Sequence, residues 1–279
     1  MNKFISKILL AMAISCLAMC MVSCTDSSTS KQDSIRVGID LKFPPFSYIG
    51  QDGSAQGLEP QIAKAFGDYL GKPVEIVDTD FSLLIPALET GDIDIIIADM
   101  ARTDDRSKKV AFTKPYRYTQ SLALVNKDYY SKMNINNSMK PEEFFHLPGS
   151  KFVGLAGTSG VLVPQRYNAE VLEVTEIGSG IQEVINGSAT ALVASNEVVG
   201  FQAANPQTTM VHAIGNVSQA CFAVRLGDKE MLESANAFID SMYVDGGFYD
   251  NAKSQWDSII AEFMKNESYG LDYIIYPPK

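Results

Sequence analysis

From Ser34 onward, short runs of β-branched and aliphatic residues alternate with amphipathic segments. The runs predict strands, and segments with apolar residues three or four positions apart predict helices. The first half should contain strand 35–39, helix 60–70, strand 73–77, a helix that Ser82 caps and Gly91 ends, and strand 93–98. The last of these is mostly apolar, which is typical of a buried parallel strand. This alternation predicts an α/β fold with parallel sheets.

A second set of elements follows the same order. Strand 151–156 precedes a helix around residues 181–185, and strand 191–194 comes next. The spacing Ile85–Gly91–Asp99 equals the spacing Ile181–Gly187–Ser195, which favours two similar lobes. Because ligands bind outside the carboxyl ends of strands in open α/β sheets, Asp99 and Ser195 should lie on opposite walls of one cleft. Two helices, around residues 232–242 and 259–263, should close the chain.

The first 23 residues predict a secretory signal peptide. Lys3 and Lys7 precede an apolar run at residues 8–22, which is too short and too rich in Cys, Ser and Met to be a good membrane span. The boundary Ser23-Cys24 resembles a bacterial lipoprotein processing site, with lipid on Cys24 and a flexible tether at residues 24–33. An ordinary signal peptide with incidental cysteines is the alternative.

Composition narrows the classes of function. With 279 residues, 46% hydrophobic and 20% charged, the chain can build one large or two modest cores. A net charge of −10 and the absence of a basic patch argue against nucleic acid as a partner. His146 and His212 are too far apart for a His-rich metal site, and we expect no cofactor. If Cys24 carries lipid, Cys221 has no disulfide partner.

Several segments, in order, resemble the polar amino-acid type of bacterial extracellular solute-binding proteins, family 3. They are Ile39-Asp40-Leu41-Lys42-Phe43-Pro44-Pro45-Phe46-Ser47-Tyr48, Gly57-Leu58-Glu59, Leu84-Ile85-Pro86-Ala87-Leu88, Gly91-Asp92-Ile93-Asp94, Arg102-Thr103-Asp104-Asp105-Arg106, Phe112-Thr113-Lys114-Pro115-Tyr116, Gly157-Thr158-Ser159 and Asp245-Gly246-Gly247-Phe248-Tyr249. The resemblance spans about residues 34–256. It implies an α/β, two-lobed periplasmic-binding-protein fold of type II, each lobe a β-sheet flanked by helices.

The resemblance also implies domain boundaries. Lobe 1 should comprise residues 34–121 plus 222–279, and lobe 2 residues 122–221, with hinge closure on ligand. Two crossover hinge strands should lie near residues 121–124 and 220–223. The segment after Trp256 runs beyond the family's usual end and receives no assignment.

Arg106 matches the arginine that grips the ligand's carboxylate in this family, a role suited to a planar guanidinium. The alternative is a surface arginine paired with Asp104 or Asp105. Thr158 and Ser159 follow a predicted strand and a glycine, where helix amides and hydroxyls suit an anion. Ordinary helix capping is their alternative, since it needs the same residue types.

Three further positions match family ligand contacts. Phe43 and Phe81 resemble the aromatic walls of the site, and packing in a core is their alternative. Asp40 matches a position that can contact a polar ligand side chain, and its alternative is a loop cap. Lys42 is expected to be a solvated loop residue.

Two positions depart from the family pattern. Ala101 stands where a Ser or Thr usually contacts the carboxylate, and Ser195 where an Asp usually receives the α-ammonium. An uncompensated buried ammonium costs about 3–5 kcal/mol, so another acid compensates or the ligand lacks the ammonium. Asp99 is the first candidate acid and Glu197 the second. A strand-end hydrogen bond to nearby backbone is the alternative for Asp99.

The resemblance implies a lipid-anchored extracytoplasmic receptor on a bacterial membrane, in the periplasm or at the cell surface. It would capture an amino acid or related carboxylate for an ABC permease, as a monomer and not as an enzyme. Two alternatives stay open. One is a cyclohexadienyl or arogenate dehydratase on the same fold, with Glu197 or Asp99 as general acid. The other is a ligand-sensing surface lipoprotein.

Overall fold

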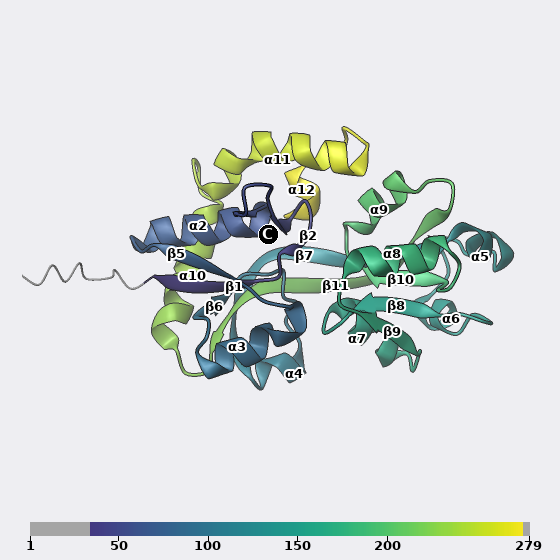
Figure 1. Cartoon of the computed structure of the whole chain (residues 1–279), viewed down its shortest axis with the longest axis horizontal. Coiled ribbons are helices and arrows are strands. Elements are labelled where there is room, and N and C mark those ends of the chain that lie inside the picture. The colour runs from purple at the N-terminus through teal and green to yellow at the C-terminus, as the bar shows by residue number, and fades with distance from the viewer. Residues whose placement is uncertain (1–33, 276–279) are drawn as a thin grey trace, which may run out of the picture. The chain divides into compact units, whose positions relative to one another are not determined.

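Two long strands, β7 (Val110–Asn126) and β11 (Thr209–Arg225), run side by side through the computed structural model, which describes residues 34–275 (Figure 1). They pair antiparallel along almost their whole length, with interruptions between Ala213 and Val217 and again between Ala220 and Ala223. Other strands flank them on both sides, so this ribbon connects the two ends of one sheet.

The large sheet has eight strands in the order β5-β1-β6-β11-β7-β10-β8-β9. The first strand group is β5 (Val74–Asp78), β1 (Ile35–Ile39) and β6 (Ile95–Ile96), which are parallel to one another. The second strand group is β10 (Ala191–Ala194), β8 (Phe152–Leu155) and β9 (Val171–Val174), also parallel. The expected parallel pairing is therefore confirmed within each group, while β7 and β11 join the groups by antiparallel pairing.

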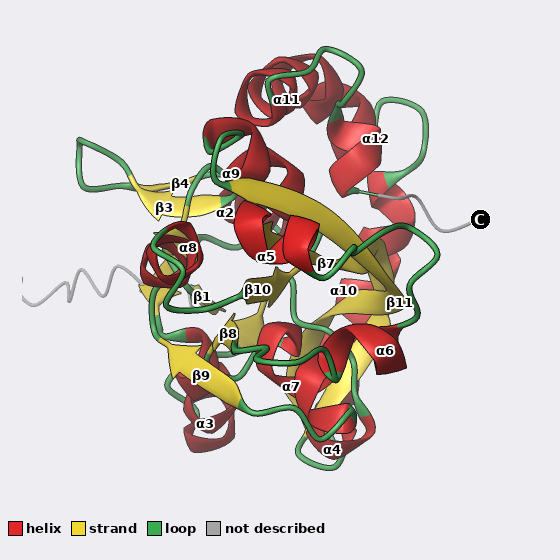
Figure 2. Ribbon diagram, turned by 90° about the vertical axis from the view of Figure 1, so that its right-hand side faces the viewer, coloured by secondary structure: helices red, strands yellow, loops and turns green. Residues whose placement is uncertain are grey.

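Helices cover both faces of this sheet (Figure 2). They are α2 (Leu58–Leu70), α3 (Leu84–Thr90), α4 (Asp104–Ser107), α5 (Lys127–Lys132), α6 (Pro141–Phe145), α7 (Ser159–Arg166), α8 (Ile177–Ile185), α9 (Val198–Ala204), α10 (Lys229–Met242), α11 (Phe248–Met264) and α12 (Leu271–Ile274), with a 3-10 turn at Phe81–Leu83. A small separate sheet contains β2 (Lys42–Phe43), β3 (Ser47–Ile49) and β4 (Ala55–Gln56).

Most elements expected from the pattern are present, with altered ends. Strand β6 is shorter than the apolar run that predicted it, and α8 ends at Ile185 with Asn186 as its C-cap. The predicted cap at Ser82 is wrong, because Ser82 lies inside the 3-10 turn and α3 begins at Leu84 without a side-chain cap. Gly91 does end α3, in the left-handed conformation that favours glycine.

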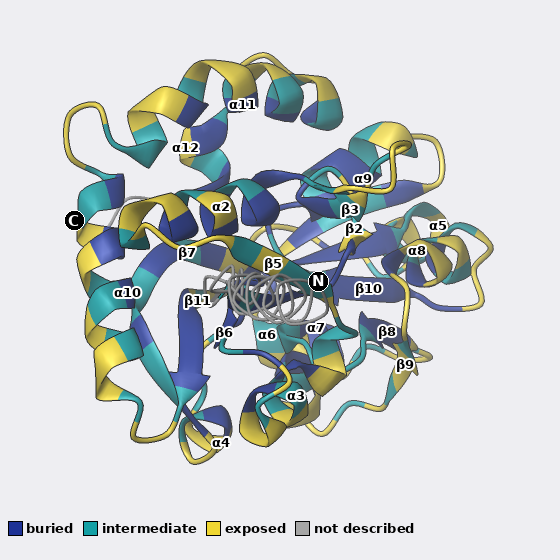
Figure 3. Ribbon diagram, turned by 60° about the vertical axis from the view of Figure 1, so that its left-hand side comes forward, coloured by how far each residue is buried: buried dark blue, intermediate teal, exposed yellow. Residues whose placement is uncertain are grey.

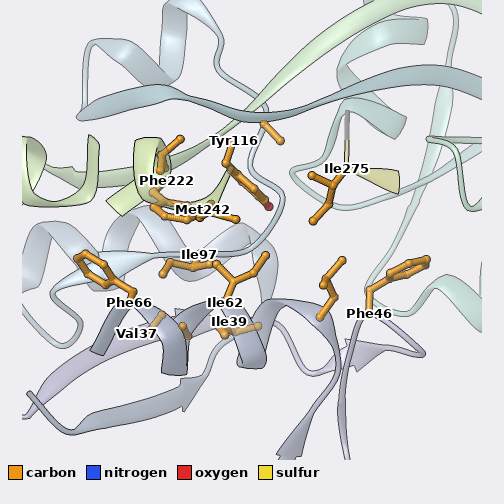
Figure 4. Close-up of a cluster of buried hydrophobic side chains, with 14 of the residues drawn as sticks. Val37, Ile39, Phe46, Ile62, Phe66, Ile97, Tyr116, Phe222, Met242 and Ile275 are labelled. Atoms are coloured by element: carbon orange, nitrogen blue, oxygen red, sulfur yellow. The ribbon is translucent and has the colours of Figure 1, made fainter. Parts of the chain in front are cut away.

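Apolar side chains fill the space between sheet and helices, and exposed residues lie on the outer helix faces (Figure 3). The largest cluster joins β1 and α2 to α10, α11 and the end of the chain (Figure 4). Ile275 belongs to this cluster, as do Tyr116 and Phe222. Two other clusters pack on the second strand group, one of them around Phe144 and Phe152. Both strand groups therefore have apolar cores of their own.

Within residues 34–275, no helix is both long and apolar enough to cross a membrane. In the same range Cys221 is an unpaired, buried thiol. Cys24 and the predicted signal peptide and tether lie outside the described residues.

Candidate functional site

A cavity lies at the carboxyl ends of parallel strands from both groups. Asp40 follows β1, Asp99 follows β6, Thr158 follows β8, Thr175 follows β9, and Ser195 follows β10, and all five line this cavity. Its volume is about 100 Å³. Open α/β sheets bind ligands at this edge, because loops rather than strand backbone surround the strand ends there. The topology thus creates a small, two-sided chamber.

All nine residues predicted to contact ligand line the cavity. They are Asp40, Phe43, Phe81, Asp99, Ala101, Arg106, Thr158, Ser159 and Ser195. Glu59 and Arg117 also line it, although sequence analysis did not propose them as ligand contacts. The sequence offered little reason to propose them. Glu59 appeared only as the last residue of the Gly57-Leu58-Glu59 motif, and Arg117 belonged to no motif.

Arg106 is a buried cation without an acidic partner in the described part of the chain. Its residue is 9% exposed, and Nη1 donates to the Ala101 carbonyl at 2.5 Å while Nη2 donates to the Gly157 carbonyl. The predicted alternative of a surface pair with Asp104 or Asp105 is wrong, since Asp105 pairs with Lys108 instead. Burial lowers the pKa of Arg106 to about 10, so the group stays charged at neutral pH. A ligand anion would supply the missing charge.

Local structure fixes the position of this guanidinium. Thr103 caps α4 by accepting a hydrogen bond from the Arg106 amide at 3.2 Å. The guanidinium carbon lies 5.5 Å from the centre of the Phe81 ring. Because backbone carbonyls and an aromatic face hold it from several sides, Arg106 is oriented before any ligand arrives.

Aromatic side chains form one wall of the cavity. The ring centres of Phe43 and Phe46 lie 5.8 Å apart, and Phe201 meets Phe43 edge-on at 6.2 Å. Phe43 therefore packs against apolar neighbours and lines the cavity as well. Phe201 lies on α9 and belongs to an apolar cluster of the second strand group. Its contact with Phe43 therefore joins β2 to that group.

Two predicted ligand residues also have the structural roles that were their alternatives. Asp40 accepts hydrogen bonds from the backbone amides of Lys42 and Phe81, so it organises two loops. Thr158 caps α7 by accepting from the Gly160 amide at 3.1 Å. Lys42 was expected to be a solvated loop residue, but it is the first residue of β2 and also lines the cavity, where it pairs with Asp80 and stays partly exposed.

Asp99 forms an ion pair with Arg117 on β7. Arg117 Nε donates to Asp99 Oδ1 at 2.8 Å, and Arg117 Nη1 donates to the Ile274 carbonyl at 3.2 Å. Although burial alone would lower the pKa of Arg117, Asp99 and the neighbouring acids raise it, so Arg117 remains charged. The alternative for Asp99, a bond from its carboxylate to nearby backbone, is not what the structure shows, because Arg117 occupies both oxygens.

Two buried glutamates complete the charged lining. Glu59 Oε1 accepts from the Tyr116 hydroxyl at 2.8 Å, and Glu197 Oε1 accepts from the Ser195 amide at 2.8 Å. Burial raises the pKa of each to about 7. Among residues 34–275, no group of three or more His, Cys, Asp or Glu side chains is arranged to hold a metal ion. The cavity contains several carboxyl groups and one guanidinium, that of Arg106, which has no acidic partner among the described residues. This guanidinium suits a small ligand that bears a carboxylate.

Known proteins resemble this chain over most of its length. A probable histidine-binding protein from Campylobacter jejuni is 28% identical over 265 residues, which cover 92% of this chain and 99% of that protein. An L-arginine-binding protein from Pseudomonas aeruginosa is 27% identical over 221 residues, which cover 77% and 84%.

Solved structures share the fold. The ancestral amino acid-binding protein AncCDT-1, described as a precursor of cyclohexadienyl dehydratase, has 31% identity and a TM-score of 0.69, covering 80% of this chain and 96% of that chain. The holo form of ArgBP from T. maritima has 29% identity and a TM-score of 0.66, covering 82% and 95%. These similarities confirm the type II periplasmic-binding-protein fold. The model of bacterial extracellular solute-binding proteins, family 3, matches residues 35–259, and the chain therefore belongs to that family.

Proposed function

We propose that this protein captures an amino acid or a related small carboxylate outside the cytoplasm and delivers it to an ABC importer. The observation that carries the proposal is Arg106, a buried guanidinium that lines the cavity and lacks an acidic partner among the described residues. A buried charge without a counter-charge is costly, and a ligand carboxylate removes that cost with two parallel hydrogen bonds. The similar proteins that are named for binding histidine and arginine support this ligand class.

The two strand groups are the two lobes of the proposed receptor, residues 34–121 plus 222–279 and residues 122–221. Apolar clusters on each side and cavity residues from both support this division. Ligand contacts with both lobes would favour a closed arrangement, and β7 and β11 would act as the hinge.

The proposed receptor is a monomer anchored by lipid on Cys24, after removal of residues 1–23. Residues 24–33 would tether it to a bacterial membrane, in the periplasm or at the cell surface. The apolar run followed by Ser23-Cys24 and a Ser-rich segment supports this localisation. The proposed macromolecular partner is an ABC permease, and no catalytic step is part of the function.

A thermal-shift screen tests the ligand class. The panel contains the standard amino acids, their keto and decarboxylated forms, and short peptides. A ligand at a hundred times its Kd stabilises the folded state by about 2.7 kcal/mol, which produces a clear rise in Tm. We expect the stabilising compounds to share a carboxylate. Stabilisation by decarboxylated amines alone, or by no member of the panel, would count against the proposal.

A dehydratase acting on cyclohexadienyl acids is the second candidate. Glu197 favours it, because a buried glutamate with a pKa of about 7 that lines a cavity can serve as general acid. The description of AncCDT-1 as a dehydratase precursor is consistent with the idea. Turnover of prephenate or arogenate by the purified protein, lost in Glu197→Gln, would establish this function. The receptor proposal predicts that neither compound is consumed.

A further inference from the structure

Four carboxyl side chains line the cavity, and two of them are already fully engaged. Asp40 uses one oxygen for the Lys42 amide and the other for the Phe81 amide. Asp99 uses both oxygens for Arg117. A ligand cation would therefore have to compete with existing donors at either residue.

Glu59 has one oxygen that accepts no hydrogen bond from the described residues, and the Glu197 carboxyl group accepts only from the Ser195 amide and its own backbone amide. For Glu59 this is Oε2, which is buried without a hydrogen-bond partner. Glu197 is 8% exposed and lines the cavity. Glu197 is thus the carboxyl group of the four at which no donor from a distant part of the chain competes with a ligand.

The charges around Glu197 favour a cation at this place. Asp99, Arg117 and Tyr273 lie near enough to interact electrostatically with Glu197. Arg117 already forms an ion pair with Asp99. The local set of Glu59, Asp99 and Glu197 carries three acids against this one guanidinium. Across the same cavity, Arg106 needs an anion. The lining is therefore charged with opposite signs at two different points.

We propose that Glu197 receives the cationic group of a dipolar ligand whose carboxylate binds Arg106. This inference rests on the proposed function and adds a specificity-determining residue to it. Position 195 offers only the Ser195 hydroxyl, and the Ser195 amide instead donates to Glu197 Oε1 and holds that side chain in place. In this proposal, the acid that balances the ligand's ammonium stands at position 197, before α9, and not at position 195 as is usual in the family.

Matched ligand pairs test the assignment. Calorimetry compares each standard L-amino acid that stabilises the protein with its 2-hydroxy analogue, which keeps the carboxylate and lacks the ammonium. Glu197→Gln keeps the size and the acceptor for the Ser195 amide, and Glu173→Gln on exposed β9 is the matched control. Loss of one charged hydrogen bond should weaken amino-acid binding by about tenfold to a hundredfold in Glu197→Gln, with little change in Glu173→Gln.

The analogue series gives the second readout. The wild-type protein should prefer an amino acid over its 2-hydroxy analogue, and Glu197→Gln should lose most of that preference. Amino-acid binding that is as tight in Glu197→Gln as in wild type would overturn this inference and leave the proposed function standing. Preference of the wild type for the 2-hydroxy acids would also overturn it. Failure of both ligand series to bind would overturn the proposed function and, with it, this assignment.

Discussion

Glu59 and Glu197 give the folded chain a distinctive dependence on pH. Burial raises their pKa values from 4.5 to about 7. Between these two pH values, both groups are protonated in the folded state and deprotonated in the unfolded state. Stability falls with rising pH wherever the folded state binds more protons. The contribution of both groups is therefore fully present below about pH 4.5 and disappears as pH rises through about 7.

Urea denaturation of the ligand-free protein between about pH 5 and 8 measures this effect. We expect the unfolding free energy to decrease over this interval by a few kcal/mol, since each unit of pKa difference is worth about 1.4 kcal/mol. Glu197→Gln should show a shallower decrease, because the amide mimics the protonated acid at every pH. Equal slopes for the two proteins would show that Glu197 does not titrate near neutrality.

At the scale of elements, apolar runs were sufficient to predict β1 and β10, because both strands are buried by layers on each side. The full length of β7 could not be predicted from pattern. Polar residues interrupt it, yet Thr113, Arg117, Thr119 and Ser121 are buried in the structure. Their burial depends on partners brought in from distant segments, which periodicity does not contain.

The same limit applies to the site. Resemblance to a family was enough to predict Arg106, Phe43 and Thr158 as residues of the site, but it did not predict the Asp99–Arg117 pair. That pair depends on the position of β7 and on the left-handed backbone of Asp99, whose φ is 50°. The short helix α12 was also missed, because four residues are too few to show a helical period.

Helix α12 lies against residues that line the cavity or adjoin it. The Ile274 carbonyl accepts from Arg117, and the Tyr273 carbonyl accepts from Asn196 at 2.7 Å. Asn196 in turn accepts from the Gln120 amide on β7. Leu271 and Ile274 are buried in the largest cluster. Helix α12 therefore connects β7 with the loop that carries Ser195 and Glu197.

Truncation after Gly270 should remove this support. Each fully buried leucine or isoleucine side chain contributes about 1.5–3 kcal/mol, so we expect a loss of several kcal/mol in unfolding free energy. Leu271→Ala tests the contact without removing backbone, and a loss of about 2–5 kcal/mol is expected. Wild-type denaturation midpoints for the truncated and substituted proteins would contradict a packing role for α12.

At the scale of the whole molecule, the proposed hinge predicts a change in dimensions. Strands β7 and β11 connect the two strand groups, and the cavity contains residues from both. Small-angle scattering should show a smaller radius of gyration at saturating ligand than without it. The ligand-free profile of Arg106→Ala should match that of the wild type, and addition of ligand should leave it unchanged. Expansion of the wild-type particle on binding would contradict hinge closure.

The proposed anchor is tested on full-length protein expressed in a bacterial host. Cys24→Ala should leave an unmodified, mislocalised precursor that carries no lipid, whereas the wild type should be processed and lipid-modified. Cys20→Ala is the matched control, since it removes a cysteine inside the proposed signal peptide and leaves Ser23-Cys24 intact. Recovery of the wild-type chain as a soluble, secreted protein without lipid would contradict the anchor.

Calorimetric affinity of Arg106→Ala for the ligand identified by thermal shift is the most direct test of the receptor. We expect a loss of about a hundredfold, because the charge-assisted hydrogen bonds are worth roughly 3 kcal/mol. Arg106→Lys should recover little, since a point charge cannot make the forked contact. Arg102→Ala, which removes a nearby exposed charge, should bind like the wild type. Unchanged affinity in Arg106→Ala would contradict the proposed binding of the ligand carboxylate by Arg106 and the function that rests on it.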